Sequence, residues 1–206
     1  MRIITGKYRG MAIAMPQGIR PTQNRIRKAL FDVIGDIEGL TFLELFAGSG
    51  AVGFEARSRG CGRLVFVEHD RNCVQAIRRN IEALKFADCE LFPLEAGRAI
   101  EFLKKNRQKF DLIFVDPPYY KRRAAGPGSG AQGLASEEES LAKKTLQTVG
   151  ACDILAPNGF VIVQHFKKDN LPDRQGVLIL CKQIRHGDTM LSFYEHVPES
   201  HLPGKL

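Results

Sequence analysis

The chain has 206 residues, of which 44% are hydrophobic, so it can build one well-packed domain and is short for two. No run of 18 apolar residues is present and the first residues lack an apolar leader, so we expect no membrane contact and a cytoplasmic location. The five cysteines are scattered and never in C-x-x-C spacing, which argues against a disulfide framework and a zinc site.

The net charge of +7 is concentrated at the start of the chain. Residues 1–35 hold seven Lys and Arg against the single acidic residue Asp32, whereas the rest of the chain carries 23 basic and 22 acidic groups. A block this one-sided suits the neutralisation of phosphates in a nucleic acid. The alternative is a basic segment that is merely solvated.

Two small elements are predicted at the start of the chain. Residues 1–15 alternate loosely around two glycines, which predicts a short β-hairpin that carries basic side chains. A helix is predicted from an N-cap at Thr22 to about Ile34, because apolar residues recur at helical spacing and Gly35 follows. Arg25, Lys28 and Asp32 of this helix lie away from its apolar stripe, so the positive charges can face a ligand.

After Gly39, short apolar runs alternate with helical segments. Strands are predicted at 41–46, 63–68, 89–94, 110–115 and 159–166, with helices ending near 56, 84, 106 and 154 between them. Nearly continuous apolar strands separated by helices predict a parallel sheet covered on both faces, the doubly wound α/β class. The last two strands flank the turn His186-Gly187-Asp188 and predict an antiparallel hairpin at a sheet edge.

Residues 121–140, with the sequence KRRAAGPGSGAQGLASEEES, are predicted to form a flexible loop. The segment holds four glycines and few large apolar groups, so it cannot pack a core. Because it follows the fourth strand directly, a gate over a substrate is one interpretation and plain disorder is the other.

The stretch ELFAGSGAVGFE, residues 44–55, places three glycines in G-x-G-x-x-G spacing between a strand and a helix. This arrangement is typical of nucleotide sites at the carboxyl end of an α/β sheet. Glu68 ends the second strand 20 residues after Gly48 and can accept hydrogen bonds from both ribose hydroxyls. These features fit both a dinucleotide and an adenosine-bearing cofactor without phosphates.

Glu44 favours the second kind of cofactor. Its carboxylate lies near the end of the first strand, beside the position that a pyrophosphate would occupy, and would repel a dianion. It suits the ammonium group of S-adenosylmethionine, directly or through water. The alternative is that Glu44 is a buried structural carboxylate.

The second discriminating motif is Asp116-Pro117-Pro118-Tyr119, directly after the fourth strand. An amino group conjugated to a base ring is a poor nucleophile, so an enzyme that methylates it must draw both N–H bonds toward fixed acceptors. The Asp116 carboxylate and the Pro117 carbonyl are the candidate acceptors, the prolines restrict the backbone, and Tyr119 offers a ring face for the base. Outside this fold position, the same four residues would form an ordinary turn.

With these motifs together, the chain resembles class I S-adenosylmethionine-dependent methyltransferases, and more closely the bacterial enzymes that methylate guanine N2 in small-subunit 16S ribosomal RNA. RIITGKYRG looks like that family's opening hairpin, and RPTQNRIRKALFDVIG looks like its R-P-T-x-x-R-x-R helix. ELFAGSGAVGFEARSRG, FVEHD and DPPY look like its glycine, ribose and catalytic motifs. The resemblance covers most of the chain, and the combination is far more specific than any one motif.

The resemblance implies a Rossmann-like sheet of seven strands with an antiparallel C-terminal hairpin, S-adenosylmethionine as methyl donor, and 16S rRNA in an assembling small subunit as substrate. It divides the chain into an RNA-binding extension, residues 1–36, and a catalytic domain, residues 37–206, and we expect a monomer. The residues implied to bind the cofactor are Glu44, Phe46, Ala47, Gly48, Gly50, Glu68, Glu95 and Arg98. The residues implied to bind RNA are Lys7, Arg9, Arg20, Thr22, Arg25 and Arg27.

One position departs from the family pattern in a way that affects the cofactor site. The sequence has Gly97-Arg98-Ala99 where the family commonly has Gly-Asp-Ala, and that Asp meets the adenine amino group. Arg98 cannot accept this hydrogen bond. We expect Glu95 or a backbone carbonyl to replace it.

Other functions fit parts of the sequence. A DNA methyltransferase acting on adenine N6 or cytosine N4 also uses D-P-P-Y, but 206 residues leave little room for a target-recognition domain. A protein-glutamine methyltransferase usually carries N-P-P-Y, and a dinucleotide oxidoreductase is disfavoured by Glu44. A non-catalytic RNA-binding protein would not need Glu44, Glu68 and Asp116 together.

Overall fold

The computed structural model of the chain describes residues 1–16, 23–86, 88–118 and 139–197. Arg20, Thr22 and Tyr119 lie outside the described residues, as does the predicted loop 121–140 except for Glu139 and Ser140. Within the described residues, no helix is long and apolar enough to cross a membrane.

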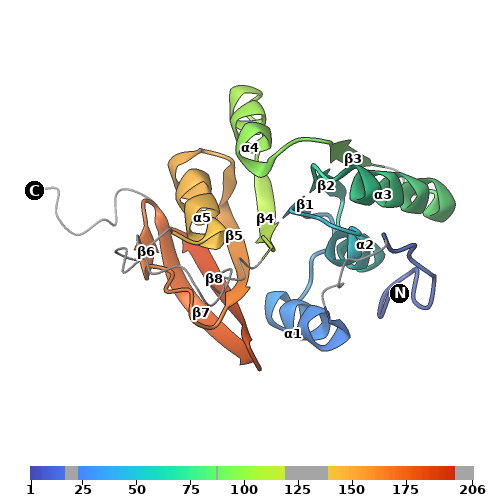
Figure 1. The fold of residues 1–206 in the computed structure, drawn as a ribbon, viewed down its shortest axis with the longest axis horizontal. Helices are drawn as coiled ribbons and strands as arrows, with labels where there is room; N and C mark the ends of the chain where they lie inside the picture. The colour runs from blue at the N-terminus through green and yellow to red at the C-terminus, as the bar shows by residue number, and fades with distance from the viewer. Residues whose placement is uncertain (17–22, 87, 119–138, 198–206) are drawn as a thin grey trace, which may run out of the picture.

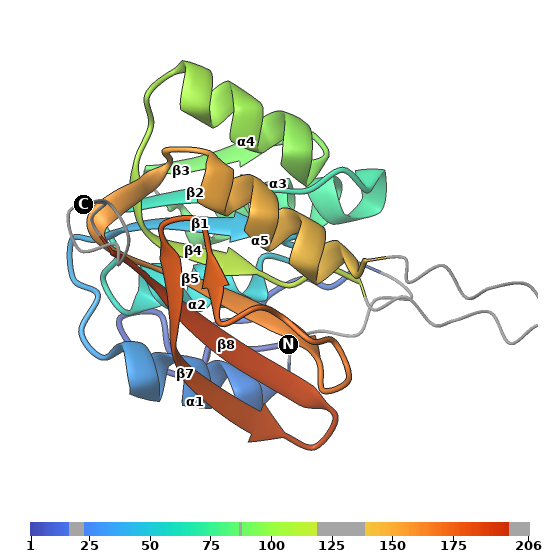
Figure 2. The same ribbon diagram turned by 90° about the vertical axis from the view of Figure 1, so that its left-hand side faces the viewer.

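The centre of the molecule is one mixed sheet in the strand order β3-β2-β1-β4-β5-β8-β7-β6 (Figures 1 and 2). The first five strands in this order run parallel to one another, and β8, β7 and β6 run antiparallel to their neighbours. The parallel strands are β1 (Thr41–Leu45), β2 (Arg63–Val67), β3 (Cys89–Phe92), β4 (Phe110–Val115) and β5 (Leu155–Phe166); the others are β6 (Arg174–Gln175), β7 (Leu178–His186) and β8 (Thr189–His196). This confirms the predicted α/β fold class with its antiparallel C-terminal hairpin.

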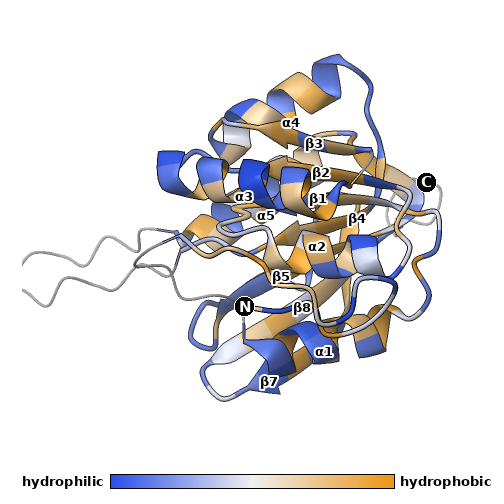
Figure 3. Ribbon diagram, turned by 90° about the vertical axis from the view of Figure 1, so that its right-hand side faces the viewer, coloured by the Kyte–Doolittle hydropathy of each residue, from blue (hydrophilic) through white to orange (hydrophobic). Residues whose placement is uncertain are grey.

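In the part of the chain that the structure describes, five helices cover the two faces of the sheet. α1 (Asn24–Ile34), α2 (Ala51–Ser58) and α3 (Arg71–Leu84) pack on one face, and α4 (Ala96–Lys105) and α5 (Leu141–Ala151) pack on the other. Alternate residues of a strand belong to the hydrophobic cores on the two faces: Phe42 to the core under α1, α2 and α3, and Leu43 to the core under α4 and α5. The central strands are therefore buried on both faces, which is why they read as continuous apolar runs, and Figure 3 shows them as hydrophobic ribbons between the helices.

The structure differs from the sequence-based expectations at the edge of the sheet and at the starts of β5 and α1. Among the described residues the sheet has eight strands, because the two-residue strand β6 pairs with β7. β6 was not predicted because it lacks the apolar run by which a strand is recognised. β5 begins at Leu155 rather than at residue 159, with a register shift opposite β4. The N-cap of α1 is Gln23 rather than Thr22, and its side chain makes no capping hydrogen bond; the helix ends at Gly35 as predicted.

The N-terminal segment forms an irregular hairpin with a single antiparallel bridge, Arg2 to Ala12, and no strand in the described residues. Ile3 N–H donates to the Met11 carbonyl at 3.1 Å. Ile3 and Ile13 are both buried in the core that α1, α2 and α3 share. The extension is thus packed into the same core as the rest of the chain.

Candidate active site

The carboxyl ends of β1, β2 and β4 meet at one edge of the sheet. Leu45 of β1 pairs with Val67 on one side and with Val115 on the other, so the residues that follow these three strands lie next to one another. They are the glycine loop that starts at Phe46, the carboxylate Glu68 and the segment that starts at Asp116. The fold therefore brings the predicted ribose, cofactor and catalytic motifs together.

The glycine loop turns sharply between β1 and α2. Gly48 and Gly50 have φ of 56° and 73°, in the left-handed region that favours glycine. Phe46 has φ of 60°, a conformation that costs about 1–2 kcal/mol in a residue with a Cβ. Strain of this kind is concentrated at functional sites. Ala47, like Phe46 a predicted cofactor residue, is buried and donates from its N–H to the Val67 carbonyl at 3.0 Å.

Glu44 lies under this loop and is only 3% exposed. Its Oε2 accepts a hydrogen bond from Gly53 N–H at 2.8 Å, which anchors the start of α2. A Cβ on Gly53 would come within 2.7 Å of the same oxygen, so the close approach requires glycine here. This contact fits the alternative that Glu44 is a buried structural carboxylate. Pairing of Glu44 with an ammonium group stays a prediction.

Burial, with a smaller contribution from the nearby Asp116, raises the pKa of Glu44 to about 8, against the hydrogen bonds from Gly53 and Val52. At neutral pH the protonated form therefore predominates. A cationic group beside Glu44 would favour its ionised form. We therefore predict that an ammonium group bound beside Glu44 would release a proton from its carboxyl group.

The raised pKa gives a prediction for Glu44→Gln. The folded-state pKa of about 8 lies above the unfolded value, so the contribution of Glu44 to stability is full below pH 4 and is lost as pH rises through 8. A pKa difference of one between the folded and unfolded states corresponds to about 1.4 kcal/mol, so several kcal/mol separate the two limits. The variant lacks this titration, and its free energy of unfolding should fall less than that of the wild type between pH 5 and 9. Urea unfolding across this range measures the difference, and parallel pH profiles would contradict it.

Glu68 holds the glycine loop against the end of β2. Its Oε2 accepts from Gly48 N–H at 2.7 Å, and its Oε1 accepts from the N–H groups of His69 and Asp70, each at 2.8 Å. A carboxylate oxygen has two acceptor sites, so Oε2 retains one for a ribose hydroxyl while Oε1 already accepts two bonds. The observed arrangement thus accommodates one ribose hydroxyl, and acceptance from both stays a prediction.

Asp116 follows β4 directly. Its N–H donates to the Leu45 carbonyl at 3.4 Å, and its side chain is partly exposed and near enough to Glu44 to raise the pKa of that group. Pro117 is buried and Pro118 is exposed. The two prolines fix the backbone and offer no N–H, so the Pro117 carbonyl and the Asp116 carboxylate are acceptors on a restricted segment.

The two predicted cofactor residues after β3, Glu95 and Arg98, are not held in place as Glu44 and Glu68 are. Glu95 is the N-cap of α4 but makes no capping hydrogen bond, and Arg98 lies in the first turn of the same helix. Both side chains are exposed. The replacement of the usual adenine acceptor by Glu95 therefore stays a prediction.

The predicted RNA-binding residues fall into two groups in the described structure. Lys7, Arg9 and Arg25 are exposed. Arg27 is fully buried, and its guanidinium donates to the Ala51 and Arg2 carbonyls and to Asn24 Oδ1 at 2.8–3.1 Å. This corrects the expectation that Arg27 faces RNA, because its donors are turned inward to backbone and side-chain acceptors.

Glu55 and Ser58 have a role that sequence reasoning missed. The buried Glu55 carboxylate accepts from Ile4 N–H at 2.7 Å and from Thr5 N–H at 3.0 Å. Ser58 Oγ donates to the Thr5 carbonyl and accepts from Tyr8 N–H. Both residues belong to α2, within the quoted glycine motif, so this helix anchors the N-terminal extension as well as the glycine loop.

The comparisons with known proteins agree with this geometry. The family described as Conserved hypothetical protein 95 matches residues 1–126. The "Putative rRNA methyltransferase YlbH" of Bacillus subtilis is 29% identical over 199 residues, covering 95% of this chain and 98% of that protein. The "Ribosomal RNA small subunit methyltransferase D" of Escherichia coli K12 is 35% identical over 122 residues, covering 58% of this chain and 60% of that protein.

Solved structures show the same fold. The structure titled "Putative methyltransferase yhhF from Escherichia coli" is 28% identical, has a TM-score of 0.73, and is matched over 95% of this chain and 97% of that one. The structure titled "Crystal structure of SMU.776, a putative methyltransferase complexed with SAH" has a TM-score of 0.61 at 16% identity, with 86% of this chain and 50% of that one covered. No cluster of three metal-ligating side chains occurs within the described ranges.

Proposed function

Because the chain belongs to the family described as Conserved hypothetical protein 95 and is an rRNA methyltransferase, we propose that its target is N2 of a guanine in 16S rRNA. The methyl donor is S-adenosylmethionine. The observation that carries the proposal is the meeting of the glycine loop, Glu44 and Asp116 at one edge of the sheet. The relatives are named as RNA enzymes, which disfavours the DNA alternative.

In the proposed mechanism, the protein positions the amine. When bound, S-adenosylmethionine supplies an electrophilic methyl group on a sulfonium. Asp116 and the Pro117 carbonyl accept the two N–H bonds of the guanine amine and aim its lone pair along the transfer line. Alignment of this kind can supply up to roughly 7–11 kcal/mol of the barrier. Asp116 would accept the amine proton, which becomes acidic on methylation, and pass it to solvent.

The rest of the chain is assigned accordingly. Residues 1–36 contact RNA and residues 37–206 carry catalysis. Tyr119 stacks on the target base, Pro118 holds the turn, and Glu68, with Glu95 near the adenine, binds the adenosine. We further propose that the protein acts as a monomer in the cytoplasm on an assembling small subunit, where the target guanine must turn outward to enter the site.

One experiment tests the proposal directly. The purified protein is supplied with S-adenosylmethionine carrying a labelled methyl group and with small ribosomal subunits from cells that lack their own guanine-N2 methylation. The RNA is digested and the labelled nucleoside is identified, with naked rRNA, DNA and protein as parallel substrates. Labelled N2-methylguanosine at one site supports the proposal. Label in another nucleoside or in DNA or protein alone overturns it, as does no label in any substrate.

A further inference from the structure

Helix α3 carries three exposed arginines that the proposed mechanism does not use: Arg71, Arg78 and Arg79. None of them forms an ion pair with a residue in the described ranges. Glu82 is the one acidic residue of the helix, so its exposed surface is basic. We call these three arginines the α3 band.

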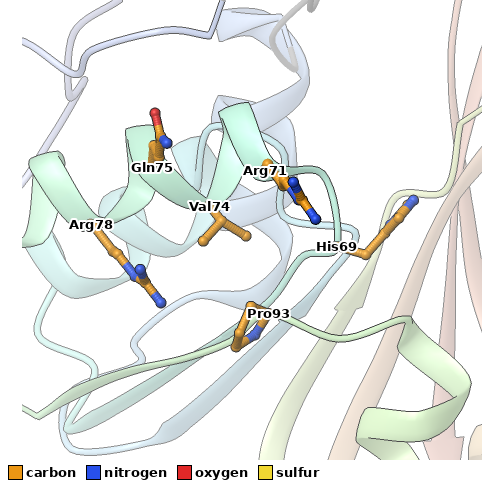
Figure 4. A pocket seen from close by; sticks show the side chains of 6 residues that line it. All are labelled: His69, Arg71, Val74, Gln75, Arg78 and Pro93. Atoms are coloured by element: carbon orange, nitrogen blue, oxygen red, sulfur yellow. The ribbon is translucent and has the colours of Figure 1, made fainter.

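The α3 band borders two hollows, one on each side of the helix. The first, of about 290 Å³, lies between α3 and the segment after β3; Figure 4 shows its lining residues His69, Arg71, Val74, Gln75, Arg78 and Pro93. The second, of about 360 Å³, includes Arg79 and lies between α3 and residues 14–16. Both are open to solvent and large enough for a phosphate group.

The N-terminal extension runs along the same helix. Asn80 of α3 accepts from Ala14 N–H at 2.8 Å and donates to the Ala14 carbonyl at 3.0 Å. Tyr8 packs edge-on against Phe86, just beyond the end of α3, with ring centroids 4.6 Å apart. Lys7 and Arg9 flank Tyr8 in the sequence, so the extension brings basic residues close to the end of α3. At its other end, the band reaches His69, which follows Glu68 of the candidate site.

We propose that the α3 band is a second RNA-contact surface, which binds phosphates of the strand that leads from the N-terminal extension to the candidate site. Guanidinium groups bind phosphate in a bidentate manner, and exposed arginines without ion pairs release counterions rather than breaking existing bonds when they do so. The inference rests on the proposed function for the identity of the RNA. It extends the predicted RNA surface from residues 1–36 to a helix of the catalytic domain.

The test compares two double variants of equal charge change. Arg78→Gln with Arg79→Gln removes two cations of the band, and Lys104→Gln with Lys105→Gln removes two exposed cations of α4, on the other face of the sheet. RNA affinity is measured for rRNA fragments across a series of salt concentrations, beside cofactor affinity and thermal unfolding.

The arginine variant should bind RNA about tenfold more weakly at low salt, with its salt slope reduced by roughly 1.5, as expected for two lost phosphate contacts. Cofactor affinity and unfolding temperature should not change, and the lysine variant should bind RNA as the wild type does. An unchanged slope in the arginine variant, or an equal loss in both variants, overturns the inference. Failure of the proposed function would show separately, as absent methylation by the wild type.

A different observation carries a second inference, about Gln164 of β5. Gln164 is 6% exposed, and its Oε1 is buried without a hydrogen bond to any residue that the structure describes. Leaving an acceptor unpaired costs about 1–3 kcal/mol. Gln164 follows Val163, which pairs with Val115, so it is placed beside Asp116 at the end of the neighbouring strand. Ile162 lies on the face of α1, α2 and α3, and strand alternation puts Gln164 on the same face as Glu44.

We infer that Gln164 is a specificity-determining residue whose Oε1 accepts the N1–H of the target guanine. N1–H is adjacent to the N2 amine that Asp116 is proposed to hold, so two neighbouring strands would present acceptors to two neighbouring donors of one base. Adenine has an acceptor at N1 and would face the Gln164 carbonyl unfavourably. This inference also rests on the proposed function, and it specifies which edge of the base the pocket recognises.

The test uses RNA with 2-aminopurine in place of the target guanine. This base keeps the 2-amino group but lacks the N1–H. The wild type should prefer guanine in kcat/KM by about tenfold or more, the value of one hydrogen bond that leaves a buried polar group unpaired when lost. Gln164→Leu should lower kcat/KM for the guanine RNA and reduce the preference for guanine over 2-aminopurine. Gln164→Glu keeps an acceptor and should retain this preference.

If Gln164→Leu lowers kcat/KM equally for both RNAs, Gln164 has a merely structural role and the inference is overturned. The inference is also overturned if kcat/KM changes for neither RNA. Cofactor affinity and thermal unfolding establish that the variants are folded. Absence of methylation of both RNAs by the wild type would count against the proposed function instead.

Discussion

Replacing Asp116 with alanine is expected to lower the methylation rate by at least about 1,000-fold while leaving the affinity for S-adenosylmethionine within about tenfold. The side chain is proposed to hold the amine of the target base and to pass on its proton, and the cofactor contacts are assigned to other residues. Single-turnover methylation measures the first effect, and equilibrium binding of the cofactor measures the second. Asp116→Asn keeps one acceptor oxygen and should show an intermediate rate.

The same variant has an electrostatic consequence that can be checked. Asp116 raises the pKa of Glu44, so its removal should lower that pKa and extend the ionised form of Glu44 to lower pH. Cofactor affinity in the variant should therefore depend less on pH between 6 and 8 than in the wild type. Loss of cofactor binding in a folded variant would instead place Asp116 in the cofactor site and contradict its assignment.

Arg27→Ala is expected to destabilise the protein by about 3–5 kcal/mol, because it removes a buried guanidinium that donates three hydrogen bonds and leaves a cavity in its place. The Arg27 guanidinium joins α1 to the Arg2 carbonyl and to the start of α2. Burial lowers the pKa of Arg27, and the nearby Glu55 raises it. Without Arg27, these buried acceptors lose their donor. Urea unfolding with linear extrapolation measures the loss.

Arg25→Ala is the matched control on the same helix. Arg25 is exposed, so its replacement should change the free energy of unfolding by less than about 0.5 kcal/mol but reduce the salt slope of RNA binding by about one phosphate contact. Under conditions in which it is folded, Arg27→Ala should instead lower the free energy of unfolding and leave the salt slope of RNA binding unchanged. Equal free energies of unfolding for the two variants would mean that the buried Arg27 side chain contributes nothing to stability.

The elements of the sheet could be predicted because their periodicities are local. The central strands are buried on both faces and therefore appear as apolar runs, and β1, β2 and β4 match their predicted ranges to within a residue. The site could be located for a related reason. Residues that follow parallel strands meet at one sheet edge, so the positions of Glu44, Glu68 and Asp116 in the sequence were enough to bring them together.

What could not be predicted depends on partners distant in the sequence. Arg27 looks like any basic residue of an amphipathic helix, and only the carbonyls of Arg2 and Ala51, which the fold brings to it, explain its burial. Glu68 was correctly placed at the strand end, but its hydrogen bond from Gly48 N–H depends on the turn of the glycine loop. No sequence pattern marks the Gln164 carbonyl as unpaired, because that depends on every neighbour.

The position of β8 determines when the sheet can be completed. β8 (Thr189–His196) is the last described strand in the sequence, yet it lies between β5 and β7 and pairs with both. During synthesis, β5 therefore leaves the ribosome with an open edge that exposes the backbone of Val161 and Val163, and this edge stays open until residue 196 has emerged. Open apolar edges pair with other chains, so premature termination before β8 should produce aggregation rather than a smaller folded protein.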